Sequence, residues 1–112
     1  MNHSNITGLM RGFTVLVCLN FSVELESGKC HLILDLAESE IIGAKSIRAE
    51  FSGVSNLCLK NLGGGINQLL CLAIEDIRDR QLDRISYQVQ ELEEDSLSFY
   101  CQSLSISALN SE

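Results

Sequence analysis

Three consecutive glycines, Gly63-Gly64-Gly65, lie between two apolar segments and form the stretch most similar to a phosphate-binding loop. Such a loop needs a Lys and a Ser or Thr directly after its last glycine, to reach the phosphates and the magnesium ion. Ile66 and Asn67 follow here, and the G-x-G-x-x-G spacing of a dinucleotide-binding loop is not present. We therefore expect a backbone turn that tolerates positive φ and binds no nucleotide.

Histidine-based catalysis has few candidates, because the chain holds two histidines and His3 lies near its start. His31 stands between Cys30 and Leu32 in an alternating run, which favours an exposed or hydrogen-bonded strand residue over a general base. A cysteine nucleophile beside His31 stays open, although no family signature points to one. No catalytic residue is predicted.

The five cysteines, at positions 18, 30, 58, 71 and 101, are odd in number and far apart in the sequence. They lack the C-x-x-C spacing of a zinc knuckle or a redox site, so we expect no metal and no cofactor. Cys18, Cys58 and Cys71 have apolar neighbours, among which a thiol packs as a small hydrophobe. The pattern predicts buried free thiols and a reducing, cytoplasmic compartment.

Carboxylates gather in two segments, and neither has the alternating oxygen ligands and central glycine of a calcium loop. In residues 75–84 they alternate with arginines, which predicts a surface segment of offsetting charges. The second segment predicts a solvated turn and is the candidate partner-binding site. Its acidic residues are Glu91, Glu93, Glu94 and Asp95.

The net charge is −7, from eight Lys plus Arg against fifteen Asp plus Glu. This balance opposes binding to a phosphate backbone, so nucleic acid is not an expected partner, whereas a basic protein would be attracted. No apolar run approaches ~20 residues, so no membrane span is expected. The length predicts one domain, with a flexible N-terminus over residues 1–12 and a single β-rich domain over residues 13–109, as a monomer or small homo-oligomer.

Apolar and polar residues alternate with a period of two along most of the chain, which is typical of strands. The clearest example is a hairpin: alternation over residues 21–26, a turn at Ser27-Gly28, and a second run over residues 30–36. Residues 47–51 alternate up to Gly53, which predicts a bulge or bend. A second hairpin is expected over residues 85–101, turning at the acidic cluster, with residues 104–108 as a long return arm.

Residues 66–80 fit two periods, because Ile66, Leu69, Leu70, Ala73 and Ile77 have helical spacing while residues 69–74 also suit a strand buried on both faces. We favour the strand. Seven or eight short strands predict an all-β fold, an antiparallel sandwich or barrel-like single domain. A helix at about 66–80 would make the fold α+β instead. One core is expected, made of Phe51, Val54, Leu57, Leu72, Ile74, Val89 and Phe99.

The segments FSGVSNLCLKN (residues 51–61), LAIEDIRDRQLDRISYQVQELEEDSLSFYC (72–101) and the following SLSI resemble a class of small, β-rich, uncharacterised bacterial proteins. Some of these are similar to immunity proteins of contact-dependent toxin systems. The resemblance covers roughly residues 47–106 and is a pattern of hydrophobic spacing. It implies a fold and a partner class, and it transfers no functional residue.

The leading functional hypothesis is a non-catalytic, cytoplasmic protein-binding domain, an immunity-type inhibitor of a basic toxin, because a catalytic set is missing and the chain is acidic. One alternative is a small-molecule-binding or enzymatic β-domain with an internal pocket lined by Cys71, Tyr87 and Tyr100. Another is a structural module that self-assembles through an exposed strand edge.

Overall fold

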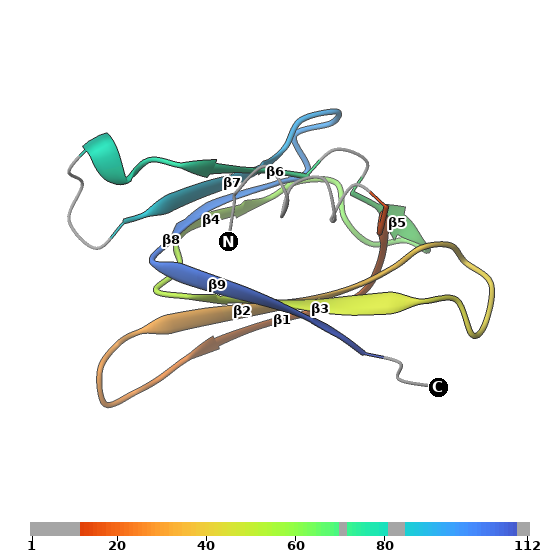
Figure 1. The fold of residues 1–112 in the computed structure, drawn as a ribbon, viewed down its shortest axis with the longest axis horizontal. Helices are drawn as coiled ribbons and strands as arrows, with labels where there is room; N and C mark the ends of the chain where they lie inside the picture. Colours follow the sequence, from red (N-terminus) through yellow and green to blue (C-terminus); the bar gives the residue numbers. More distant parts are fainter. Residues whose placement is uncertain (1–11, 70–71, 81–84, 110–112) are drawn as a thin grey trace.

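Two antiparallel sheets lie face to face in the computed structural model, which describes residues 12–69, 72–80 and 85–109 (Figure 1). The nine strands are β1 (Val15–Val23), β2 (Cys30–Ala37), β3 (Ser46–Ser52), β4 (Ser55–Leu59), β5 (Asn67–Gln68), β6 (Leu72–Asp76), β7 (Tyr87–Glu91), β8 (Leu97–Cys101) and β9 (Ser103–Ala108). A short 3-10 helix, η1 (Arg78–Arg80), follows β6.

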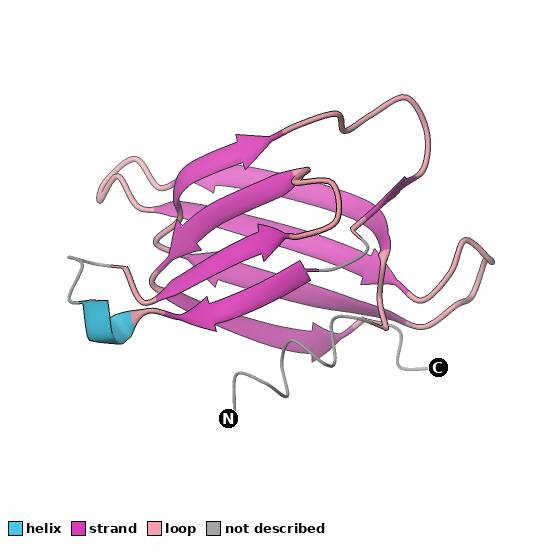
Figure 2. Ribbon diagram, turned by 90° about the horizontal axis from the view of Figure 1, so that it is seen from above, coloured by secondary structure: helices cyan, strands magenta, loops and turns pink. Residues whose placement is uncertain are grey.

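One sheet has five strands in the order β5-β1-β2-β3-β9, and the other has four in the order β4-β8-β7-β6. Figure 2 shows the four-stranded sheet lying over the five-stranded one. The predicted all-β, antiparallel sandwich is therefore confirmed. A helix at about 66–80 is not formed, because the described residues of this segment are in β5, β6 and η1.

The predicted first hairpin is formed by β1 and β2, which pair from Val15↔Ala37 to Val23↔Cys30. Its turn is closed by two backbone hydrogen bonds, from Glu24 N–H to the Lys29 carbonyl (2.8 Å) and from Gly28 N–H to the Glu24 carbonyl (2.7 Å). Gly28 has a φ of 74°, a left-handed conformation that glycine adopts without a steric penalty. The alternation ends before Leu25, which lies in this turn and is 94% exposed.

Two of the chain's crossings between the sheets, from β3 to β4 and from β8 to β9, form adjacent corners. Gly53 (φ 68°) turns the chain from β3 into β4, as the sequence predicted, and Val54 N–H donates to the Cys30 carbonyl at 3.1 Å. At the second corner, Gln102 N–H donates to the Ser52 carbonyl at 2.9 Å. The strand expected as the return arm of the second hairpin therefore leaves β7 and β8 and pairs with β3 as β9.

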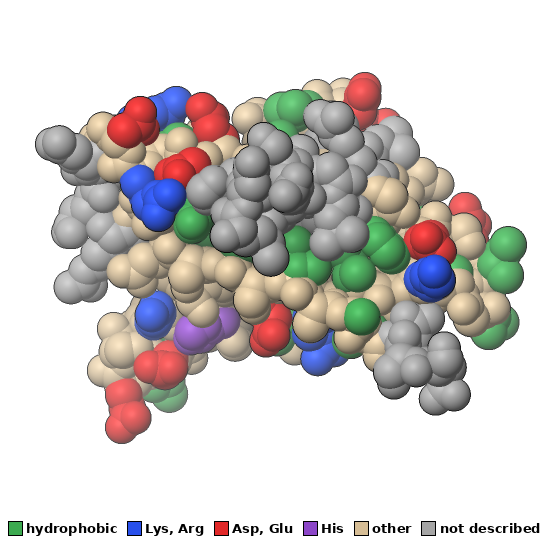
Figure 3. Space-filling view, in the orientation of Figure 1, with side chains coloured by type: hydrophobic (Ala, Val, Ile, Leu, Met, Phe, Trp, Pro, Cys, Tyr) green, Lys and Arg blue, Asp and Glu red, His purple; other side chains and the backbone are tan. Residues whose placement is uncertain are grey.

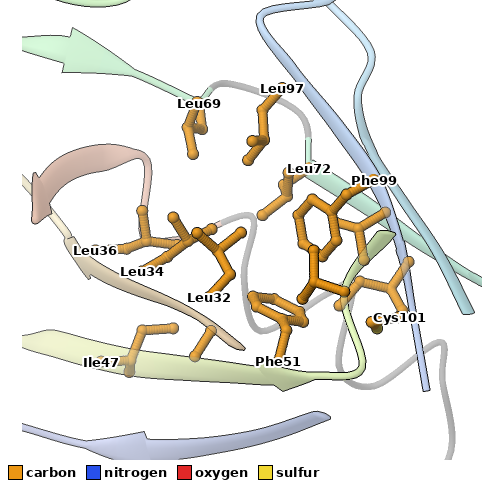
Figure 4. Packing of buried hydrophobic residues seen from close by; sticks show 14 residues of the cluster. Leu32, Leu34, Leu36, Ile47, Phe51, Leu69, Leu72, Leu97, Phe99 and Cys101 are labelled. Atoms are coloured by element: carbon orange, nitrogen blue, oxygen red, sulfur yellow. The ribbon is translucent and has the colours of Figure 1, made fainter. Parts of the chain in front are cut away.

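The core fills the space between the sheets (Figure 4). Six of the seven predicted core residues are fully buried there, and Leu57 is partly buried against them. Phe51 on β3 meets Phe99 on β8 edge to face, with ring centroids 4.8 Å apart and planes at 76°. Residues from both sheets thus stabilise the sandwich through one continuous apolar contact. Its buried members are Leu32, Leu34, Leu36, Ile47, Ala49, Phe51, Val54, Leu69, Leu72, Ile74, Val89, Leu97, Phe99 and Cys101.

Candidate partner-binding site

The turn between β7 and β8 is organised by the buried carboxylate of Glu91, which is 1% exposed. Its Oε2 accepts a hydrogen bond from Glu93 N–H (3.0 Å), and its Oε1 accepts one from Glu94 N–H (2.9 Å). Oε1 also accepts from the backbone N–H (3.3 Å) and the hydroxyl (3.2 Å) of Ser96. These charge-assisted bonds offset the cost of removing the carboxylate from water and fix the turn.

Glu91 is therefore not a solvated rim residue, contrary to the sequence-based expectation. Alternation along β7 directs its side chain to the same side as Val89, whose partner across the ladder is Phe99 in the core. The carboxylate is used internally to satisfy the backbone of the turn. The candidate partner-binding surface therefore excludes Glu91 and consists of the exposed residues after it in the turn.

The exposed tip of this turn consists of Leu92, Glu93 and Glu94, with Asp95 after them. Leu92 is 54% exposed, and no ion pair to Glu93 or Glu94 occurs among the residues that the structure describes. Leu92 was not among the predicted site residues, although a leucine between glutamates in a turn breaks the alternation. The turn therefore presents an exposed apolar side chain beside two acidic ones, on a backbone that the Glu91 carboxylate holds in place.

Asp95 differs from its neighbours because it is paired. Its Oδ2 lies 3.0 Å from Lys60 Nζ, and both side chains are about half exposed. The hydrogen bond from Lys60 and its positive charge lower the pKa of Asp95, and the same hydrogen bond and the negative charge of Asp95 raise the pKa of Lys60. Asp95 has a φ of 55°, and Lys60 N–H donates to the Ser96 carbonyl at 2.9 Å. The pair thus joins the acidic turn to the end of β4.

Two carboxylates of residues 75–80, those of Glu75 and Asp76, are paired with arginines, as predicted for residues 75–84. Arg78 contacts Asp76, Arg80 lies 3.3 Å from Glu75, and positions 81–84 lie outside the described residues. On the outer face of the five-stranded sheet, Arg48 donates two hydrogen bonds to Asp35, at 2.8 and 3.0 Å. The face shown in Figure 3 carries acidic side chains in both layers and at both ends of the molecule.

His31 is a hydrogen-bonded strand residue, as expected. Its Nδ1 lies 3.2 Å from the Ser52 hydroxyl, and its Nε2 lies 3.6 Å from a Glu24 carboxylate oxygen. The pKa of Glu24 is lowered, first by the Ser27 hydroxyl, which donates to it, and also by His31. Both ring nitrogens thus face oxygen atoms, an arrangement that does not activate a thiol.

The four cysteines that the structure describes are free, but the prediction of burial is wrong for two of them. Cys18 and Cys58 are exposed, Cys30 is partly exposed, and Cys101 is buried. Cys18 and Cys58 have apolar neighbours, and because successive strand residues point to opposite faces, such neighbours do not bury the residue between them. Burial raises the pKa of the Cys101 thiol to about 12. Within the described residues, no cluster of His, Cys, Asp or Glu could hold a metal ion.

The glycine run forms a backbone turn, in agreement with the sequence. Gly63, Gly64 and Gly65 have φ values of 110°, 76° and 134°. The Asn67 side chain closes the turn, accepting from Gly63 N–H at 3.2 Å and donating to the Gly65 carbonyl at 2.9 Å. The Gly63 N–H and the Gly65 carbonyl thus have their hydrogen-bond partner, the Asn67 side chain, within the loop itself.

The tyrosines proposed to line an internal pocket lie on opposite faces of their sheet. Tyr87 pairs with the buried Cys101, whereas Tyr100 lies between Phe99 and Cys101 and points to the other side. Position 71 lies outside the described residues. An open hollow of about 690 Å³ does occur, between the β1–β2 turn and the corner at Gly53, but it is lined by neither tyrosine. The proposed pocket is therefore not formed by this pair.

The fold and the turn define a class of protein: a small all-β sandwich with a filled core and an ordered acidic turn on its surface. A family model described as Immunity protein PIM8 matches residues 9–107, and the chain belongs to this family. Searches of curated proteins and of solved structures found no match. The resemblance to toxin-system immunity proteins is thus confirmed, and membership implies a toxin as the binding partner. No described helix is long and apolar enough to cross a membrane.

Proposed function

We propose that this protein is a non-catalytic, cytoplasmic immunity protein that neutralises a basic toxin. It would bind the toxin through the turn of Leu92, Glu93 and Glu94. The observation that carries the proposal is the Glu91 carboxylate, which holds this turn through four hydrogen bonds. A turn that is already ordered loses less conformational entropy when it binds. Leu92 would enter an apolar pocket of the toxin while the two glutamates contact cations around it.

The charge of the chain supports a basic partner. With a net charge of −7, the protein would attract a cationic toxin and accelerate the encounter, an effect that salt weakens. The exposed, free thiols of Cys18 and Cys58 support a reducing compartment, since such thiols would oxidise outside the cell.

The experiment that tests the function begins with capture from a lysate of the native host at low and moderate salt. The retained protein is identified by mass spectrometry and then expressed in a susceptible strain, with and without the immunity protein. We expect growth arrest that the immunity protein relieves. A captured protein that does not arrest growth, or an arrest that is not relieved, would contradict the immunity function.

A pair of matched variants tests the turn. Glu93→Lys reverses a charge at its tip, and Glu50→Lys reverses an exposed charge on the outer face of the five-stranded sheet. We expect Glu93→Lys to weaken toxin binding by about tenfold, mainly through a slower association, and Glu50→Lys to change it little. Equal effects of the two variants would place the contact elsewhere.

A further inference from the structure

Among the described residues, no strand covers the outer edge of β1 over most of its length. On this side of the five-stranded sheet, β5 pairs only with Val15 and Leu16, and the register shifts at the following residue, Val17. Figure 1 shows the start of β1, in dark red, beside β5 at the right of the molecule. In the described part of the chain, residues 18–23 pair with β2 on one side and with no strand on the other.

The hydrogen-bond phase of β1 identifies which backbone groups are unpaired. Glu24 N–H donates to the Lys29 carbonyl, so in an antiparallel ladder Ser22, Asn20 and Cys18 direct their backbone groups toward β2. The residues between them point the other way. The edge therefore presents the N–H and C=O groups of Leu19, Phe21 and Val23, spaced as a pairing strand requires.

The same edge is apolar and unprotected. Val15–Val23 contains no charged residue, and Val17, Phe21 and Val23 are 63%, 44% and 49% exposed. Natural edge strands avoid unwanted pairing by means of charges, prolines or bulges. The edge strand β6 carries Glu75 and Asp76, and the edge strand β4 has an irregular register. Over residues 18–23, β1 has none of these devices. The outer strand β9 also lacks a charge and a proline, but its exposed side chains are three serines and an alanine. The exposed large apolar side chains of β1 distinguish it from β9 and indicate that a partner covers it.

The charges near the two ends of β1 indicate what kind of partner strand the edge would bind. The β1–β2 turn carries Glu24 and Glu26 against Lys29, and the loop after β2, which borders the start of β1, carries Glu38 and Glu40 against Lys45. If two copies paired antiparallel through β1, the acidic turn of one would meet the acidic loop of the other. A strand with basic residues at both ends avoids this repulsion and gains attraction instead.

We infer that the free edge of β1 binds an extended strand of the toxin, flanked by basic residues, which becomes an added strand of the five-stranded sheet. This inference rests on the proposed function and adds a second contact surface to it. Backbone hydrogen bonds at Leu19, Phe21 and Val23 supply the pairing. The exposed side chains of Phe21 and Val23 supply apolar contact on the core side of the sheet.

Amide hydrogen exchange followed by NMR tests the inference at single residues. The probe is the toxin domain captured and sequenced as described above. In the free protein, we expect the amides of Leu19, Phe21 and Val23 to exchange faster than those of Asn20 and Ser22. Adding the toxin domain should slow the first three amides by at least about tenfold and leave the other two nearly unchanged, because they are already bonded to β2.

A proline on each outer strand supplies the matched pair of variants. Phe21→Pro removes an outward N–H without breaking the ladder to β2, a position that tolerates proline. Ala108→Pro makes the same change on β9, the outer strand on the opposite side of the sheet, where Ala108 is exposed. We expect Phe21→Pro to weaken toxin binding by about tenfold and Ala108→Pro to leave it unchanged. If Phe21→Pro does not fold, the exchange experiment on the unmodified protein still decides.

The outcomes separate the two proposals. Protection confined to the turn at residues 92–96, with toxin bound, would overturn the edge contact and leave the immunity function intact. A captured protein that is not toxic would overturn both. Protection of the β1 amides in the absence of toxin, with a mass of two chains by light scattering, would assign the edge to a second copy and overturn the inference.

Discussion

A β-carbon on Gly53 would lie 2.6 Å from the β-carbon of Gln102, because the crossings from β3 to β4 and from β8 to β9 touch at this point. Gly53 also has a φ of 68°. We expect Gly53→Ala to lower the free energy of unfolding by ~2–4 kcal/mol, from the left-handed backbone and the steric overlap together. Gly64→Ala is the control, because its φ is 76° but nothing lies within 4 Å of the added carbon. Gly64→Ala should lower the free energy of unfolding, measured by thermal unfolding, by only ~1 kcal/mol.

The edge-to-face contact of Phe51 and Phe99 predicts a large loss of stability when one ring is removed. Phe99 is 2% exposed and joins the two sheets, so Phe99→Ala should destabilise the protein by ~3–5 kcal/mol. Urea unfolding followed by circular dichroism measures this change. A shift under ~1 kcal/mol would show that the sheets do not depend on this contact.

The carboxylate of Glu91 predicts a local loss of order. Glu91→Ala should cost ~2–4 kcal/mol, because it removes a charged acceptor from three amides and a hydroxyl. Exchange of the Glu93, Glu94 and Ser96 amides should accelerate more than exchange in β7. Glu93→Ala, at an exposed neighbour, is the control and should change stability by less than ~0.5 kcal/mol. Equal effects would contradict the role assigned to Glu91.

The ion pair of Lys60 and Asp95 predicts a pH dependence. The pKa of Asp95 is lowered below its ordinary value of 3.8 in the folded state, so the pair contributes stability above about pH 3.8. That contribution is lost as the pH falls through the lowered value. Lys60→Met should move the Asp95 pKa upward, toward 3.8, in an NMR titration of the side-chain carboxyl carbon. An unchanged pKa would show that Lys60 does not contact Asp95 in solution.

The four described cysteines should differ in reactivity toward a thiol reagent at neutral pH. Cys18 and Cys58 are exposed, whereas Cys101 is buried and its pKa is raised to about 12. Mass spectrometry of the labelled peptides should show modification of the first two within minutes and of Cys101 only on unfolding, since the thiolate is the reactive form. Rapid labelling of Cys101 in the folded protein would contradict its burial.

The candidate site was partly visible in the sequence. The run from Glu91 to Asp95 predicted a turn, because its four acidic residues separate two alternating segments, and that turn is present. The separate role of Glu91 was not visible. Whether a carboxylate at the end of a strand meets water or the backbone of the next turn depends on the path of the chain around it.

The sequence by itself determined most of the strands, the first hairpin, the bend at Gly53 and part of the core, because side-chain alternation and turn preferences act between neighbouring residues. The tertiary structure alone decided which sheet each strand joins. It moved β9 away from its hairpin, separated Tyr87 from Tyr100, exposed Cys18 and left the edge of β1 open. A period of two assigns a residue to one of two faces, but the partner of each face and edge is chosen by contacts between residues far apart in the chain.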